Sequence, residues 1–157
     1  MRFIEEVVVD EFLPTVRSML AEALRERGFT QSEVADALGI SQSAVSKYAA
    51  GDVARHDRIV ADDRVRDLVE RVGEGLASGD LTPVAALIEI EVLVRQLEEG
   101  DLLADLHEEA MPALAEADVE FSVHDPDSGL RERERVLTSV RRGLRTLTNA
   151  SGFAGLI

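Results

Sequence analysis

The strongest constraint on the fold of this chain is a glycine, Gly39, set between two short runs of helical periodicity. Glycine adopts a positive φ without steric cost, so it permits the sharp turn that joins two closely crossing helices. Ala35, one helical turn earlier, is small enough for such a crossing. The apolar residues of the stretch are placed to close a small core: Val34, Leu38, Ile40, Val45 and Tyr48. Residues 31–48 therefore predict a helix-turn-helix.

Capping residues mark the start of both helices. Thr30 and Glu33 have the Thr-x-x-Glu spacing of a capping box, in which each side chain satisfies a free backbone donor. Ser41 is a good N-cap for the second helix, expected from Gln42 to about Ala50, and Gly51 follows as its stop. The short polar groups left on the outer face of this second helix suit base edges and phosphates: Gln42, Ser43, Ser46 and Lys47.

The composition favours packed helices over a sheet sandwich. Hydrophobic residues make up 45% of the chain but aromatic residues only 4%, so the core must consist of Leu, Val and Ala. Pro14 is placed as the first-turn proline of a helix that reaches Arg27, whereas Val7–Val9 fits a strand or a helix. The polar stretch Asp52–Asp63 is interpreted as the exit from the module. We predict an all-α protein with a helix-turn-helix DNA-binding domain in residues 1–58 and a helical dimerisation or regulatory region in residues 59–157.

Two stretches of the second region predict self-association. Thr82-Pro83 opens a helix to Leu97 whose apolar residues occupy nearly all sides, and such a helix is expected to be buried. In a chain this small, the expected cover is a partner subunit. After a turn-rich stretch over 121–129, which fits a short strand, residues 131–149 form a last helix with a short coiled-coil seam: Leu137, Val140, Leu144 and Leu147. A homodimer would place two recognition helices in successive major grooves about 34 Å apart, on a pseudo-palindromic operator.

The net charge of −14 lies away from the motif. The stretch from Pro14 to Arg58 contains six basic and six acidic residues, so the remainder carries the whole excess of acid. This segregation matters because phosphate contacts favour a surface that is not acidic. Lys47 is the only lysine among 17 basic residues, and an acid-rich, lysine-poor composition resembles that of haloarchaeal proteins. In molar salt, exposed charges are screened within about 3 Å, which mutes repulsion from DNA.

Residue content excludes or leaves unsupported several other classes of function. The chain has no cysteine, which excludes disulfides, thiolate metal sites and cysteine catalysis. No apolar run approaches the roughly 20 residues of a membrane span, and the acidic N-terminus is unlike a signal peptide, so we expect a soluble, cytoplasmic protein. His107 and His124 have carboxylate neighbours but lack the spacing of a helical zinc site, and no metal or cofactor is expected. No phosphate loop, nucleophile elbow or distinctive acid-base pair predicts an enzyme.

The segment QSEVADALGISQSAVS closely resembles the Cro and phage-repressor (XRE) class of helix-turn-helix. The resemblance extends over roughly Pro14 to Arg58. The resemblance implies that Gln31 braces Gln42 and that Gln42 reads adenine. It further implies that Ser43 is a second base reader and that Lys47 lies near the DNA backbone. The expected partner is thus double-stranded DNA, and the full set of expected DNA-binding residues is Gln31, Ser41, Gln42, Ser43, Ser46, Lys47 and Arg55.

The wider chain resembles a family of archaeal regulators in which a segment like Phe12-Leu13-Pro14-Thr15-Val16-Arg17 precedes the motif. Some members continue into a thiamine-phosphate synthase-like domain, and residues 152–157 resemble the start of that domain. The resemblance is compatible with a natural short form or with a truncated chain. Some relatives also carry cysteines near the segment 102–107, which has none here, so a metal-sensing role is not expected.

Several alternatives remain open at this level. The motif could instead dock a protein, as in an antitoxin-like regulatory module, or the chain could be a truncated relative of a thiamine-phosphate synthase fusion. His56, just past the motif, fits a phosphate contact or a plain exit loop equally. The six arginines between 131 and 145 fit a second DNA contact or a face paired with another subunit. The operator, the sign of regulation and any small-molecule effector are not identified by these residues.

Overall fold

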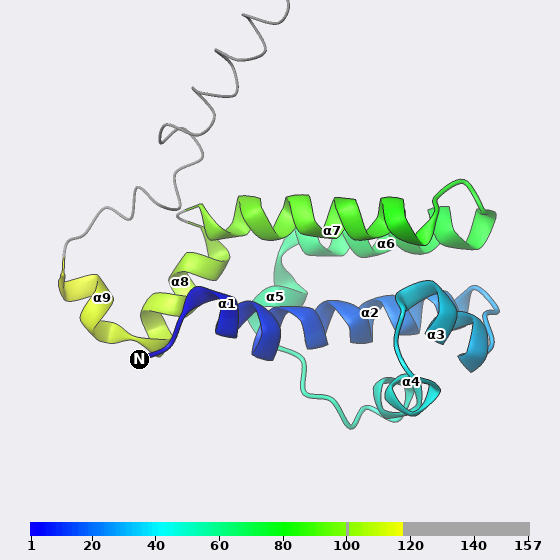
Figure 1. Cartoon of the computed structure of the whole chain (residues 1–157), viewed down its shortest axis with the longest axis horizontal. Coiled ribbons are helices and arrows are strands. Elements are labelled where there is room, and N and C mark those ends of the chain that lie inside the picture. Colours follow the sequence, from blue (N-terminus) through cyan, green and yellow to red (C-terminus); the bar gives the residue numbers. More distant parts are fainter. Residues whose placement is uncertain (100, 118–157) are drawn as a thin grey trace, which may run out of the picture. The chain divides into compact units, whose positions relative to one another are not determined.

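The computed structural model describes residues 1–99 and 101–117, and within these ranges every regular element is a helix. The predicted all-α fold is confirmed (Figure 1). These described residues belong to one compact unit. The expectations for residues 121–129 and 131–149 lie outside the described residues. No helix in the described part combines the length and the apolar content that a membrane crossing requires.

The helical segment at the N-terminus begins well before Pro14. Three elements follow one another without a break: α1 (Ile4–Val7), the π-helical turn η1 (Val8–Phe12) and α2 (Leu13–Glu26). Pro14 does lie in the first turn of α2, but the expectation that the helix starts there was incomplete. In η1 the N–H of Leu13 donates to the carbonyl of Val8, five residues back. This wider turn gives room to the proline ring, which in a regular helix clashes with the carbonyl four residues earlier.

The predicted helix-turn-helix follows as α3 (Gln31–Leu38) and α4 (Gln42–Ala49), both of which pack against α2. The next element, α5 (Asp57–Ala61), lies within the stretch interpreted as a polar exit, and its Ile59 is fully buried. The next helix, α6 (Asp63–Ser78), packs along α2. The core of the described unit therefore runs through α2, with α3 and α4 joining it from one end.

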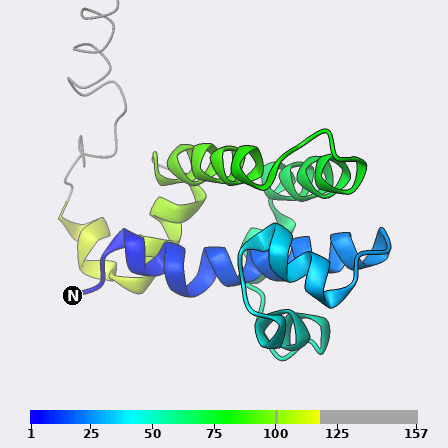
Figure 2. The ribbon, with the colours of Figure 1, turned by 45° about the vertical axis from the view of Figure 1, so that its right-hand side comes forward.

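The last described helices are α7 (Pro83–Glu98), α8 (Leu102–Ala110) and α9 (Pro112–Glu116). α7 packs against α6 and α8, and α8 also contacts α1. In Figures 1 and 2, α6 and α7 lie on one side of α2 and α4 lies on the other. Within this unit α7 buries one face: Ala86, Leu93 and Leu97 face the core, and four other large apolar side chains are exposed. Cover of the exposed face by a partner subunit stays a prediction.

The segments 1–58 and 59–117 share a core, because α2 of the first packs most extensively on α6 of the second. The assignment of the second segment to dimerisation or regulation stays a prediction. Its described part supplies the helices α6, α7 and α8, which brace the N-terminal helix from the side away from α4. The fold thus leaves α4 at the edge of the unit, where a partner can reach it.

Candidate nucleic-acid interface

The turn between α3 and α4 has the predicted geometry. Gly39 adopts φ 63°, in the left-handed region where glycine is unstrained. Its N–H and that of Ile40 both donate to the carbonyl of Ala35, which closes the end of α3. Ile40 is half-buried, so the chain turns directly into the next helix with an apolar residue facing inward. The glycine therefore performs the role that its position in the sequence predicted.

Both helix starts are capped as predicted. At α3 the N–H of Glu33 donates to Thr30 Oγ1 at 3.2 Å, and the N–H of Thr30 donates to Glu33 Oε2 at 2.7 Å. The backbone hydrogen bond from Thr30 holds the pKa of the Glu33 carboxyl below its usual value, and the Thr30 side chain adds to the effect. At α4 the N–H of Ala44 donates to Ser41 Oγ at 3.1 Å. Ser41 is thus occupied as a cap.

The inner face of the motif is closed. Val34 and Val45 are fully buried, and Ala35 is 6% exposed at the crossing of the two helices. Leu38, Ile40 and Tyr48 are half-buried and pack against this core. A larger side chain at position 35 would separate α3 from the helices beside it, because packed interiors do not absorb extra methylene groups without shifts. The steric argument made from the sequence is therefore confirmed at these positions.

The outer face of the motif carries exposed polar groups, as expected. Gln31, Gln42, Ser43, Ser46 and Lys47 are all exposed, together with the cap Ser41. The two glutamines do not bond to each other. Gln42 Nε2 donates to Ser32 Oγ at 3.4 Å, and Ser46 Oγ donates to Gln31 Oε1 at 3.3 Å. Two long hydrogen bonds thus link α3 to α4 across the motif.

Ser32 is the residue that sequence reasoning missed. It lies beside Gln31 in the first turn of α3, and its hydroxyl meets the amide of Gln42. The resemblance assigned the bracing of Gln42 to Gln31, whereas in this chain each glutamine pairs with a serine of the other helix. The sequence places Ser32 in the first turn of α3 and Gln42 in the first turn of α4, but it does not pair them. Only the crossing angle of the helices decides which pair meets.

Lys47, the one cation within residues 31–48, forms no ion pair with an acidic side chain of the described residues. In residues 1–99 and 101–117, seven of the eleven Arg and Lys residues form ion pairs with carboxylates. The four without such a pair in those ranges are Arg17, Arg25, Lys47 and Arg95. Three of these four lie on α2 and α4, and Arg25 donates to the carbonyl of Phe29 at 2.7 Å. An acidic chain therefore keeps positive charge available around the motif.

Arg55, expected to contact DNA, is engaged with α2. Its Nε donates to Ser18 Oγ at 2.9 Å, and its guanidinium lies 2.7 Å from Glu22 Oε2. Next to it, the backbone N–H of His56 donates to the buried hydroxyl of Thr15 at 2.9 Å. These contacts fix the loop after α4 on the flank of α2. A role of Arg55 at DNA stays a prediction, and its observed contacts are those of a residue that positions the loop.

The histidine considered as a metal ligand has another contact. His107 Nε2 lies 2.6 Å from the carbonyl oxygen of Arg2, so it ties α8 to the N-terminus. His124 lies outside the described residues. Among the residues that the structure describes, no three His, Asp or Glu side chains gather in a way that could hold a metal ion.

A comparison with protein families matches residues 20–55 to the family described as helix-turn-helix. The match begins in the second half of α2, covers α3 and α4, and ends at Arg55. No curated protein and no solved structure matches the chain. The family match does not reach residues 152–157, and the resemblance there to a thiamine-phosphate synthase-like domain stays a prediction. Geometry and family agree on one conclusion: the chain carries a helix-turn-helix domain of the XRE type, the domain of DNA-binding transcription regulators.

Proposed function

We propose that this protein is a sequence-specific transcription regulator that binds a pseudo-palindromic operator as a homodimer. The proposal rests above all on the exposed polar face of α4, where Gln42, Ser43 and Ser46 stand at the helix start and Lys47 follows. In a helix-turn-helix the N-terminal residues of the second helix contact base edges in the major groove. α4, with its continuation to Ala50, is the recognition helix in this proposal.

The amide of Gln42 is suited to adenine. An adenine offers N7 as an acceptor and its N6 amino group as a donor, and a glutamine can satisfy both. In this chain one N–H of Gln42 is directed to Ser32, while the second N–H and the carbonyl oxygen remain for a base. Ser32 thereby limits the rotamers of Gln42 before DNA arrives, which lowers the entropy lost on binding.

Other residues of the face are assigned to the DNA backbone. Gln31 accepts from Ser46 through Oε1, so its amide nitrogen is left to donate to a phosphate. Lys47 makes no ion pair within the described part of the chain and is the only lysine in the protein, which makes it a point charge for a phosphate oxygen. Ser43 is placed as a second base reader beside Gln42.

The experiment is a selection of binding sites from random DNA by the full chain, followed by affinity measurements on the selected site. We expect a selected sequence with two-fold symmetry. Gln42→Ala should weaken binding to that site by about 1–3 kcal/mol and affect random DNA much less. Val9→Ala is the control, because Val9 is a 60% exposed, uncharged residue on η1, outside both α4 and α7.

Two outcomes of this experiment count against the proposal. An equal loss on selected and random DNA for Gln42→Ala would remove direct readout by that residue. A selection that enriches no sequence at any salt concentration would favour a protein partner for the motif. Because phosphate contacts make DNA affinity fall as salt rises, the selection and the affinity measurements are repeated at several salt concentrations before either conclusion is drawn.

The composition supports a salt-rich cytoplasm as the setting. The net charge of −14 is costly at low ionic strength, where acidic side chains repel each other and DNA. We expect the chain to stay folded and to bind its selected DNA site in molar potassium chloride. Thermal unfolding and DNA affinity measure the two. A chain that unfolds or loses its selected site only when salt is raised would contradict this setting.

A further inference from the structure

Helix α7 exposes an apolar ridge on the surface of the described unit. The exposed fractions are 68% for Val84, 56% for Leu87, 58% for Ile88 and 49% for Val92. Val84, Ile88 and Val92 are spaced by four residues, so they form one ridge along the helix. From Leu81 to Ile88 the sequence has no charged residue, although 31% of the chain is charged. This surface therefore lacks the charged side chains that are frequent in the rest of the chain.

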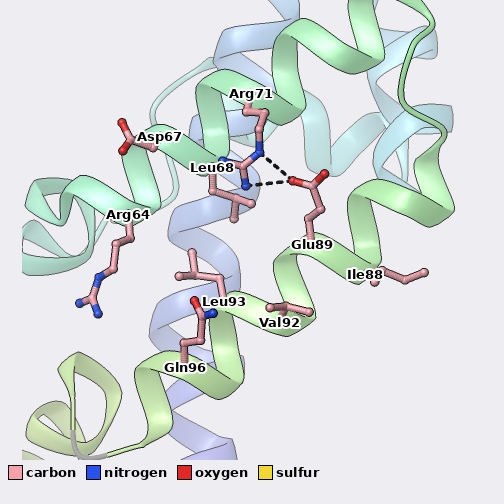
Figure 3. A pocket seen from close by; sticks show the side chains of 9 residues that line it. All are labelled: Arg64, Asp67, Leu68, Arg71, Ile88, Glu89, Val92, Leu93 and Gln96. Atoms are coloured by element: carbon pink, nitrogen blue, oxygen red, sulfur yellow. Dashed lines mark hydrogen bonds and ion pairs between the residues drawn. The ribbon is translucent and has the colours of Figure 1, made fainter.

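Two arginines beside the ridge are paired with carboxylates. Figure 3 shows the groove between α6 and α7, of about 470 Å³, with Ile88 and Val92 on its α7 side. Arg71 of α6 and Glu89 of α7 pair across this groove at 2.9 Å. Arg64, at its end, is bound by Asp62 and Asp101. A second apolar surface that approaches here meets these two arginines already paired with carboxylates.

We propose that α7 pairs with α7 of a second copy of this chain, antiparallel, with the two-fold axis passing at Ile88. The proposal rests on the homodimer of the proposed function and names its interface. A two-fold interface must be self-complementary, so a contact from one residue to another is made twice. The ridge Val84, Ile88, Val92 reads the same in both directions about Ile88. Val84 of each subunit then meets the partner subunit's Val92, and the two Ile88 side chains meet on the axis.

The charges of α7 fit the same register. Arg95 forms no ion pair with any described residue and lies seven positions after Ile88, where it meets the residue seven positions before, Leu81. The partner subunit's Asp80 stands next to that leucine, within reach of a long guanidinium side chain. Glu91 faces the small, neutral Ala85 in this register, so the two Glu91 carboxylates are not placed opposite each other. An antiparallel pair therefore matches the ridge Val84, Ile88, Val92 with itself and brings Arg95 near the partner subunit's Asp80.

This interface leaves the recognition helix open. α7 lies on the side of α2 away from α4, in both views of the unit. Pairing through α7 therefore does not cover Gln42 or its neighbours, and dimerisation and DNA contact can be tested separately. A monomer made by a change on α7 should still bind a single half-site.

The first test compares two substitutions in the full chain by sedimentation equilibrium. Ile88→Glu places two carboxylates together on the axis and should weaken dimerisation by about 30-fold or more. Val9→Glu is the matched control, since Val9 is a 60% exposed valine on η1, and it should leave the dimer unchanged. Circular dichroism confirms that both variants fold. A monomeric wild-type chain, or an Ile88→Glu variant that dimerises like wild type, would overturn the proposal.

The second test reads the register with disulfides, because the chain has no cysteine of its own. A disulfide needs Cα atoms within about 7 Å of each other. Under oxidation, Ile88→Cys should cross-link to its own copy, Val84→Cys alone should not, and Val84→Cys combined with Val92→Cys should. Self-cross-linking of Val84→Cys would show a parallel pair and overturn the register. If instead the dimer stands but Gln42→Ala binds DNA like wild type, the proposed base readout fails while this interface survives.

Discussion

The helix-turn-helix and helix α7 expose side chains of opposite kinds, polar in the first and apolar in the second. In α3 and α4 the large apolar side chains point inward, and none of them is among the exposed large hydrophobics of the described residues. α7 has a buried face too, yet four large apolar side chains on its other side meet solvent. The exposed polar side chains of α3 and α4 suit a hydrated, polar partner such as DNA. The exposed apolar side chains of α7 stay in contact with water until an apolar partner covers them.

The inward and outward sides of α4 can be separated by two neighbouring positions, and this test has the largest expected effect. Val45→Asp puts a carboxylate where Val45 is fully buried, and it should cost more than about 3 kcal/mol of unfolding free energy. Ser46→Asp puts the same group on the exposed face and should stay within about 0.5 kcal/mol of wild type. Urea unfolding at neutral pH measures both.

DNA binding supplies the second readout of that pair. Ser46→Asp should abolish binding to a selected site while the protein stays folded, since a carboxylate there repels phosphate. If Ser46→Asp instead destabilises the chain as much as Val45→Asp, then position 46 faces the core, and the division of α4 into an inner and an outer side is wrong.

The placement of α7 against α6 depends on a glycine, and its replacement has the next largest effect. A Cβ built on Gly75 would lie 2.7 Å from Leu81 Cβ, too close for two carbon atoms. Gly75→Ala should therefore cost about 1–3 kcal/mol and displace the turn into α7. Gly73→Ala is the matched control, because its Cβ would make an ordinary 3.4 Å contact with Ala23, and it should be neutral or stabilising by up to about 1 kcal/mol. Thermal unfolding of both variants checks the difference.

Ser41 and Ser43 at the start of α4 should differ in their effect on stability, and this effect is smaller than the previous ones. Ser41→Ala removes the cap that accepts from the N–H of Ala44, which should cost about 1 kcal/mol of stability. Ser43 only shares a 3.0 Å contact with Ser41 through its hydroxyl, so Ser43→Ala should change stability by less than about 0.5 kcal/mol. We expect Ser43→Ala to show its loss in affinity for the selected DNA site. Equal stability losses would mean that both serines serve the fold alone.

The elements that the sequence predicted best are those fixed by local chemistry. The boundaries of α3 follow from the Thr30–Glu33 capping box and Gly39, and the start of α4 follows from Ser41. A capping side chain acts within three residues, and a positive φ concerns one residue, so neither needs knowledge of the tertiary structure. The inward positions Val34 and Val45 follow from the same periodicity.

The features that sequence reasoning did not reach depend on neighbours in space. Pro14 marks a helix start in an isolated segment, but the π-helical turn before it lets the helix continue from Ile4. The pairing of Gln42 with Ser32 depends on how α3 and α4 cross. The count of apolar residues in α7 predicts that it is buried, but does not tell whether this chain or another supplies the cover. Val84 and Ile88 show that the described residues do not supply it.

The smallest predicted effect concerns the acid stability of the unit that supports α7. Arg64 bonds Asp62 at 2.7 Å and Asp101 at 2.6 Å, and these two aspartates cap the starts of α6 and α8. The hydrogen bonds from Arg64 lower the pKa of both carboxyls. The unfolded chain therefore takes up protons first as the pH falls below about 4, so the stabilisation is present above that pH and is lost below it.

Arg64→Gln should remove this contribution, which stays below about 1 kcal/mol because the three groups are partly exposed. Wild type should be more stable than Arg64→Gln at pH 7, and the difference should shrink toward zero near pH 3. Arg66→Gln is the control, since Arg66 pairs only with the exposed Asp63 three residues earlier and joins no second helix. Urea unfolding at several pH values measures the difference. A gap between wild type and Arg64→Gln that stays constant down to pH 3 would show that Arg64 acts through packing. The junction of α6 with α8 would then hold α7 in place without electrostatic help.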